Sequence, residues 1–288
     1  MELLQLYYFK HVAELEHVSK AAEQLHVAQP ALSQAIRRLE QEFQTTFFDR
    51  VGKNVVLNEK GKILLKYANQ IFCSIENAQR EIGDASEQEL KTLTLSIQSA
   101  SLFLPELLSE FRLRHPDAVF EVIQNADKEK SKGADVTIYS SLEKPTDDHH
   151  CILMYEPLVV ILPRGHRLEQ KSSVSLEELK EEPFINLQQG SNLYGIVEHC
   201  FKEAGFTPHV SLYCDNPGTL RELVNKNFGV ALLPEITQNC RHNPAIVAKK
   251  LEEKPYGRYI VLSWNPDKYK SRLVEDFCRV TEAFFKNL

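Results

Sequence analysis

The sequence predicts an α/β protein in three parts: a small helical N-terminal domain with one hairpin, a long helix, and a doubly wound α/β domain. Three observations predict this class. Apolar residues recur at helical spacings through most of the first 58 positions. The stretch from Glu59 to Glu87 contains no proline and keeps one apolar stripe. From Lys91 onward, strand-like and helix-like segments alternate, as expected for a doubly wound sheet.

Bulk properties limit the class of protein. The length of 288 residues and an apolar fraction of 43% suit about two domains with sizeable cores. No apolar run reaches the roughly 18 residues needed to span a bilayer. The N-terminal segment carries acids where a secretory signal would be basic and then apolar, so we expect a cytoplasmic location. The six cysteines contain no C-x-x-C pair, so neither a disulfide framework nor a zinc site is expected.

The segment from Ser19 to Glu40 predicts two short helices joined by a tight turn. Ser19 can accept a hydrogen bond from a free amide of a first helical turn, so we expect it to cap the first helix. Pro30 suits the first turn of the second helix. An inward-facing apolar row then follows at spacings of four, three and four: Leu32, Ile36, Leu39 and Phe43.

The other side of the second helix is polar and carries amides, a hydroxyl and two guanidinium groups. Its residues are Gln29, Pro30, Ser33, Gln34, Arg37 and Arg38. Two short helices with such an outer face make a helix-turn-helix, whose second helix suits a DNA major groove. The same pattern also fits two amphipathic helices of an enzyme domain whose charges are merely solvated.

The residues in and around this segment are similar to those of the LysR-type transcriptional regulators of bacteria. The resemblance rests on Ala21-Ala22, Leu25 to Val27, Gln29-Pro30-Ala31-Leu32-Ser33, Ile36, Leu39-Glu40, Phe47-Phe48, Arg50, Leu57-Asn58 and Gly61. It implies a sequence-specific DNA-binding regulator that responds to a small-molecule effector. The implied domains are a winged helix-turn-helix at 1–58, a linker and dimerisation helix at 59–88, and an effector-binding domain at 91–288.

The expected wing is a hairpin with a turn around Gly52. Arg50 and Lys53 flank this turn and could approach the phosphate backbone, which positions a protein without reading sequence. Gln34 stands where many relatives have Arg or Lys, and an amide favours adenine where a guanidinium favours guanine. Ala28 replaces the Ser or Thr cap of many relatives. The residues expected at the DNA interface are Ser19, Gln29, Pro30, Ser33, Gln34, Arg37, Arg38, Arg50 and Lys53.

Charge and the long helix both predict an oligomer. The net charge is -6, and residues 1–60 hold seven Lys and Arg against eight Asp and Glu, so DNA binding would depend on a local cluster in two copies. The long helix carries a narrow seam: Leu64, Ala68, Ile71, Ile75, Ala78 and Ile82. The seam could pack on its own chain, but the resemblance favours a homodimer, and a homotetramer made from two dimers stays open.

The second domain alternates strands and helices. Strands are expected at 92–97, 119–123, 135–138, 158–162, 184–187, 210–214, 228–234 and 259–264, and helices at 105–115, 193–204, 220–225 and 270–285. This part resembles the two-lobed, periplasmic-binding-protein-like effector domain of the same family through Leu104-Pro105, Leu162-Pro163, Pro183-Phe184-Ile185, Ala204-Gly205-Phe206 and Gly229 to Ala231. The implied lobes are 91–162 with 265–288, and 163–264.

In such a domain a ligand lies between the lobes, where strands end and helix N-termini present free amides. This geometry suits a small organic anion. The expected effector-binding residues are Ser99, Ser101, Gln188, Ser191, Asn192 and Asn216. Each of them could instead serve only as a helix cap. The segment 125–133 is short and charged where relatives carry a longer helix, so no pocket residue is carried over from it.

Two other functions compete with the regulator hypothesis. An enzyme is disfavoured because the sequence contains no G-x-S-x-G, P-loop or G-x-G-x-x-G motif, and His149-His150 has no spaced third ligand. A thiol-based, redox-responsive regulator of the same fold would use Cys200 and Cys214. The reactive cysteine of peroxide-sensing relatives would fall near 190–192, where this chain has none. We expect no catalytic residue, metal or cofactor; RNA polymerase stays open as a partner.

Overall fold

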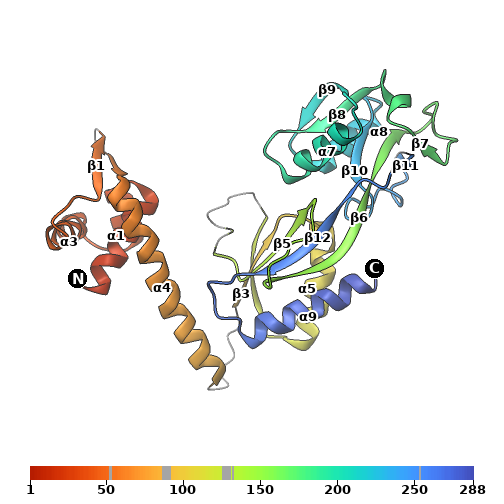
Figure 1. The fold of residues 1–288 in the computed structure, drawn as a ribbon. Coiled ribbons are helices and arrows are strands. Elements are labelled where there is room, and N and C mark those ends of the chain that lie inside the picture. Colours follow the sequence, from red (N-terminus) through yellow and green to blue (C-terminus); the bar gives the residue numbers. More distant parts are fainter. Residues whose placement is uncertain (52–53, 86–91, 125–130, 132, 253) are drawn as a thin grey trace. The chain divides into compact units, whose positions relative to one another are not determined.

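The computed structural model describes residues 1–51, 54–85, 92–124, 131, 133–252 and 254–288 (Figure 1). The chain forms two compact units. The first unit is Met1–Ser86 with Asp267–Tyr269, and the second is Glu87–Pro266 with Lys270–Leu288.

The first unit is a winged helix-turn-helix followed by a long helix. Its elements are α1 (Leu3–Leu15), α2 (Val18–Gln24), α3 (Gln29–Glu42), the antiparallel hairpin β1 (Phe48–Val51) and β2 (Asn54–Leu57), and α4 (Glu59–Ala85). The core is apolar, and the side chains of Leu6, Phe9, Leu32 and Leu39 are fully buried in it. The ring of Phe9 meets the rings of Phe47 and Phe48, so the first helix is packed directly on the start of the hairpin.

The predicted cap of α2 is wrong by two residues. His17 occupies the N-cap position, and its Nδ1 accepts a hydrogen bond from the Lys20 amide at 3.3 Å. Ser19 lies inside the first turn and is exposed. A histidine ring nitrogen can accept in the same way as a serine hydroxyl, which the usual capping preferences do not show. Ala28 is the N-cap of α3 and makes no side-chain capping bond, as the sequence indicates.

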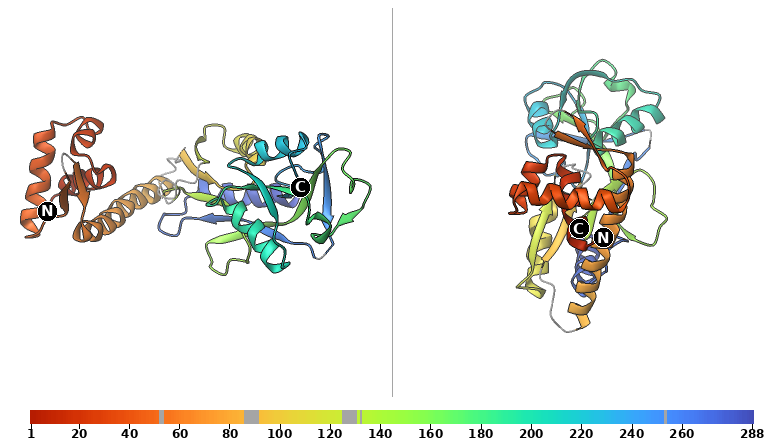
Figure 2. Two further views of the ribbon diagram at one scale, coloured as in Figure 1. Left: turned by 90° about the horizontal axis from the view of Figure 1, so that it is seen from above. Right: turned by 90° about the vertical axis from the view of Figure 1, so that its left-hand side faces the viewer.

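Helix α4 runs as one unbroken helix (Figure 1 and Figure 2). The first half of its predicted seam packs on its own chain, because Leu64, Ala68 and Ile71 join the winged-helix core. Farther along, Ile75 and Ile82 are exposed. The seam therefore serves two purposes: its beginning anchors the helix to the domain, and its end is left on the surface of the chain.

The second unit is built on one mixed sheet and a smaller parallel pair. The elements are β3 (Thr92–Ile97), η1 (Ser101–Phe103), α5 (Leu104–Arg114), β4 (Val119–Ile123), β5 (Val136–Ser141), β6 (His150–Pro163), β7 (Ser173–Val174), η2 (Glu177–Leu179), β8 (Pro183–Leu187), α7 (Asn192–Glu203), β9 (His209–Cys214), α8 (Pro217–Asn225), β10 (Ala231–Pro234), β11 (Ile246–Leu251), β12 (Gly257–Trp264) and α9 (Arg272–Lys286). The large sheet has the order β4-β3-β5-β12-β6-β11-β7, with β10 also on β6, and β8 pairs with β9.

Strand β6 belongs to both lobes of this unit (Figure 1). Its first part pairs with β12 up to Pro157, and its second part pairs with β10 and β11. The two hydrophobic cores divide accordingly: Leu153 and Ile260 belong to the first core, and Leu158 belongs to the second. The chain therefore passes from one lobe to the other near Pro157 and again just before Gly257, and not at the expected positions 162 and 264. Strand patterns indicate where a strand runs, but not which neighbours it pairs with.

Candidate DNA interface and effector cleft

The polar face of α3 lies on the surface of the first unit. Gln29, Pro30, Gln34, Arg37 and Arg38 are exposed, and Ser33 is half-buried. The Gln29 amide Nε2 donates to the Ser33 hydroxyl at 3.4 Å, so these two predicted residues lie side by side one turn apart. The opposite face of the same helix is buried, which leaves this polar face as the side available to a partner.

The hairpin is held against the helices by Glu16 and Asn58, to which the sequence analysis gave no such role. Glu16 ends α1 in a left-handed conformation, and its carboxylate accepts a hydrogen bond from the Leu57 amide at 2.9 Å. Asn58 donates to the Thr46 carbonyl at 3.0 Å and accepts from the Gly61 amide at 2.9 Å. These bonds fix β2 and the residues just before β1, and β1, which pairs with β2, carries the exposed Arg50. Lys53 lies outside the described residues, and Ser19 is exposed on α2.

In the second unit, two of the predicted effector residues, Ser99 and Asn192, both contact Ser140, a residue that the sequence did not indicate. Ser99 follows β3, is buried, and donates from its hydroxyl to the Ser140 hydroxyl at 3.0 Å. Asn192, the first residue of α7, donates from Nδ2 to the Ser140 carbonyl at 2.8 Å and lies 3.2 Å from its hydroxyl. Ser140 lies on β5 in the first lobe and Asn192 in the second, so this junction links the lobes.

The remaining predicted effector residues do not join that junction. Ser191 caps α7 by accepting from the Tyr194 amide at 3.1 Å. Asn216 caps α8 by accepting from the amides of Gly218 and Thr219. Both therefore fill the capping role that the sequence left open. Ser101 lies exposed at the start of η1, and Gln188 lies exposed before α7.

A buried ion pair joins the two strands that connect the lobes. Arg258 on β12 donates from Nε to the Glu156 carboxylate on β6 at 3.1 Å, and both side chains are almost fully buried. The same carboxylate accepts from the Ile236 amide and from both the amide and hydroxyl of Thr237. Arg258 also donates to the Ser140 hydroxyl at 3.1 Å, which connects the pair to the junction between the lobes. Burial lowers the pKa of Arg258, while the Glu156 carboxylate acts in the opposite direction.

Comparison with known proteins identifies the family. Residues 3–62 match the family described as bacterial regulatory helix-turn-helix protein, lysR family. Residues 86–285 match the family described as LysR substrate binding domain. The chain belongs to the LysR family. It is a LysR-type DNA-binding transcriptional regulator with an effector-binding domain, so the resemblance, the fold class and the main function predicted from the sequence are confirmed.

Individual relatives cover most of this LysR-type regulator. It is 34% identical over 245 residues to the transcriptional dual regulator GltC of Bacillus subtilis, which covers 82% of each chain. It is 29% identical to the regulator AlsR of the same species, over 98% of this chain and 96% of that one. Among solved structures, a full-length OxyR variant from Pseudomonas aeruginosa has a TM-score of 0.73 at 23% identity, over 98% of this chain and 94% of that one. Full-length CbnR in complex with its target DNA has a TM-score of 0.66 at 19% identity, over 98% of this chain and 99% of that one. The likeness to these two structures shows the fold.

The cysteines of the regulator lie in poor surroundings for a thiolate. Cys200 and Cys214 are buried, and burial raises the pKa of Cys214 above its ordinary value. Burial also raises the pKa of Cys240 to about 12. Since the thiolate is the reactive form, Cys214 and Cys240 are poor candidates for a redox input. Within the described part of the chain, no group of three or more His, Cys, Asp and Glu could hold a metal ion, and no helix is long and apolar enough to cross a bilayer.

Replacing Arg258 by Met should destabilise the effector domain by about 3–5 kcal/mol, because it leaves the Glu156 carboxylate buried without its counter-charge. The double variant Arg258→Met, Glu156→Leu should recover a large part of that loss. Arg279→Met is the matched control, because Arg279 forms an exposed pair with Asp276 and should cost about 0–1 kcal/mol. Urea unfolding of the four proteins measures these differences. A double variant no more stable than Arg258→Met would show that the unpaired Glu156 carboxylate is not the cause of the loss.

Proposed function

We propose that the regulator reads its operator with the exposed face of α3. In this proposal, Gln29, Pro30, Ser33 and Gln34 meet base edges and thymine methyl groups, whereas Arg37 and Arg38 bind phosphates. The observation that carries the proposal is the division of α3 into a buried apolar face and an exposed polar one. Arg50 on the hairpin adds a phosphate contact beside the groove, as does Lys53 by its place in the sequence. Ser19 on α2 is assigned to the interface from the sequence alone.

The proposed DNA-binding form is a homodimer, or a tetramer built from two such dimers. The first unit buries its own core yet leaves large apolar side chains on its surface, namely Leu3 (56% exposed), Leu4 (55%), Ile63 (61%) and Tyr67 (55%). A second copy packed along α4 would cover apolar side chains of this helix. It would also double the basic side chains available to one duplex, which a domain with balanced charge needs for affinity.

The input is proposed to be a small molecule, in the first instance a small organic anion, bound between the lobes. Support comes from the junction at Ser140, where Ser99 and Asn192 converge from different lobes. A ligand that takes over either side-chain donor would change the contact that links the lobes. The proposed site also includes Ser101, Gln188, Ser191 and Asn216, which are assigned to it from the sequence. The structure gives Ser191 and Asn216 a capping role as well.

The output is proposed to be control of transcription by binding alone, without catalysis of a reaction. Operator binding places the working protein in the cytoplasm, where bacterial DNA is located. Contact with RNA polymerase would be the next step in such a mechanism, and it belongs to the proposal.

Two substitutions on α3 should separate base reading from phosphate binding. Gln34→Arg should shift preference from adenine towards guanine at one position of each half-site, by about 1–3 kcal/mol. Arg38→Ala should weaken all sequences alike and reduce the slope of log affinity against log salt by about 1 per subunit. Selection from randomised duplexes, followed by fluorescence anisotropy over a range of salt, measures both effects. Lys180→Ala, in the effector domain, is the control. The same change of base preference in both variants would contradict this division of roles.

Ile63→Asp should weaken the dimer, because it places a charge among the exposed apolar side chains of α4. Asn69→Asp is the matched control, since it adds the same charge to an exposed position of the same helix, about 120° around its axis from Ile63. Sedimentation equilibrium should show a rise of about tenfold or more in the dissociation constant for Ile63→Asp and little change for the control. Equal dissociation constants would remove α4 from the proposed interface.

A further inference from the structure

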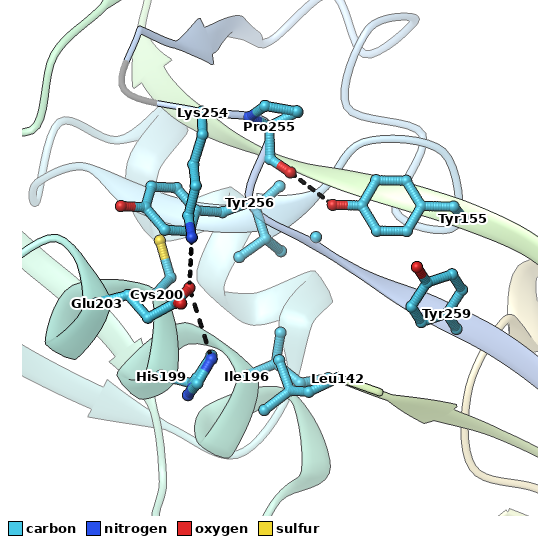
Figure 3. Close-up of a pocket in the computed structure, with 12 residues that line it drawn as sticks. Leu142, Tyr155, Ile196, His199, Cys200, Glu203, Lys254, Pro255, Tyr256 and Tyr259 are labelled. Carbon is cyan, nitrogen blue, oxygen red and sulfur yellow. Dashed lines mark hydrogen bonds and ion pairs between the residues drawn. The ribbon is translucent and has the colours of Figure 1, made fainter. Parts of the chain in front are cut away.

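A cavity of about 360 Å³ lies beside the strands that connect the two lobes (Figure 3). It is formed by β6, by α7, by Leu142 after β5, and by the segment that leads into β12. None of the six residues predicted to bind the effector is among those that line it. Its volume falls in the range of small-molecule sites, about 300–1,000 Å³.

One wall of the cavity is aromatic. The rings of Tyr155 and Tyr259 have centroids 5.2 Å apart and are inclined at 61°. The Tyr155 hydroxyl donates to the Pro255 carbonyl at 2.5 Å, which fixes the orientation of that ring. The aliphatic side chains of Leu142 and Ile196 complete the apolar lining in Figure 3. Such a wall favours a flat, apolar ring that can meet the tyrosines edge-on or in an offset stack.

The other wall carries charge. The Lys254 ammonium lies 2.9 Å from the Glu203 carboxylate and 4.8 Å from the centroid of the Tyr256 ring. His199 Nε2 lies 3.6 Å from the same carboxylate oxygen of Glu203. The hydrogen bond that Lys254 donates to Glu203 raises the pKa of Lys254 above its ordinary value, so this lysine is charged at neutral pH. Figure 3 shows these three side chains converging on the side of the cavity away from Tyr155 and Tyr259.

The balance of these charges favours a ligand with a negative charge. Glu203 is the one acid among the lining residues, and it is already shared by two basic side chains. A cationic ligand would have to compete with both of them. A carboxylate would instead use further N–H donors of the Lys254 ammonium, which form charge-assisted hydrogen bonds, and a ring N–H of His199.

We propose that this cavity is a second ligand site, for a small aromatic monocarboxylate. The carboxylate lies against Lys254 and His199, and the ring lies against Tyr155 and Tyr259. The site goes beyond the proposed function and does not depend on which molecule binds at the Ser140 junction.

The position of the cavity gives the ligand a route to that junction. Ile196, His199 and Glu203 lie four, seven and eleven residues after Asn192, which places all four on one face of α7. Asn192 donates a hydrogen bond to the Ser140 carbonyl of the other lobe, and the other three residues line the cavity. A ligand in the cavity would therefore contact α7, the same helix whose first residue links the lobes.

Isothermal titration of the full-length protein with benzoate tests the site, with benzyl alcohol and benzylamine as the neutral and cationic controls. We expect benzoate to bind and both controls to bind at least about tenfold more weakly. Lys254→Met should weaken benzoate by about tenfold or more, and Lys250→Met, an exposed lysine on β11 away from the cavity, should change nothing.

Glu203→Gln provides a test in the opposite direction. It removes the carboxylate that competes for Lys254 and His199, so benzoate should bind several-fold more tightly, a result that a damaged fold cannot produce. Ser101→Ala should leave benzoate binding unchanged, because Ser101 lies outside the cavity. The proposal is overturned if benzoate, 4-hydroxybenzoate and phenylacetate all fail to bind. It is also overturned if binding is indifferent to Lys254→Met and Glu203→Gln, or is lost in Ser101→Ala.

Discussion

The burial of one face of α3 decides what the DNA-binding unit can do. Leu32 and Leu39 are fully buried in a core with Leu6 and Phe9, and each buried leucine contributes roughly 1.5–3 kcal/mol. The same contacts prevent rotation of α3 about its axis, so the direction of the Gln29 to Arg37 face is set by packing. The polar bonds of Glu16 and Asn58 then place the hairpin beside this face. Recognition of DNA is thus proposed to depend on apolar contacts that never touch DNA.

The effector domain depends on a different kind of interaction. Its lobes share β6, and the Glu156–Arg258 pair ties β6 to β12 where the lobes change over. The pair reaches Ser140 and, through it, Ser99 and Asn192. Hydrogen bonds are directional, unlike apolar contacts, so a small change in angle between the lobes must break or rearrange some of them. A ligand at the proposed cleft, or in the cavity beside α7, would act on this network.

The sequence predicted the helices of the chain better than the contacts between distant strands. The expected bounds 105–115 and 270–285 lie within two residues of those of α5 and α9, and α3 buries Leu32, Ile36 and Leu39 of the predicted apolar row. Strand β11 was missed, and β6 begins eight residues before the expected strand, at His150, because its first part mixes polar and apolar residues without a clear period.

The candidate site shows the same limit. Capping residues such as Ser191 and Asn216 stand next to helices, so local patterns find them. Ser140 lies inside a strand and gains its importance from Ser99 and Asn192, which are distant in sequence. Glu156 and Arg258 are 102 residues apart, and nothing local marks either as buried. Long-range pairing of this kind is visible only in the folded chain.

The most direct measurement of the central claim replaces one adenine at a time with 7-deaza-adenine in the selected operator half-site. This change removes the N7 acceptor from the major groove and leaves base pairing intact. If the outer face of α3 enters the groove, one replacement should weaken binding of the wild-type protein by about 1–3 kcal/mol. That replacement should have almost no further effect on Gln34→Ala. Equal losses in both proteins at every adenine would contradict the account.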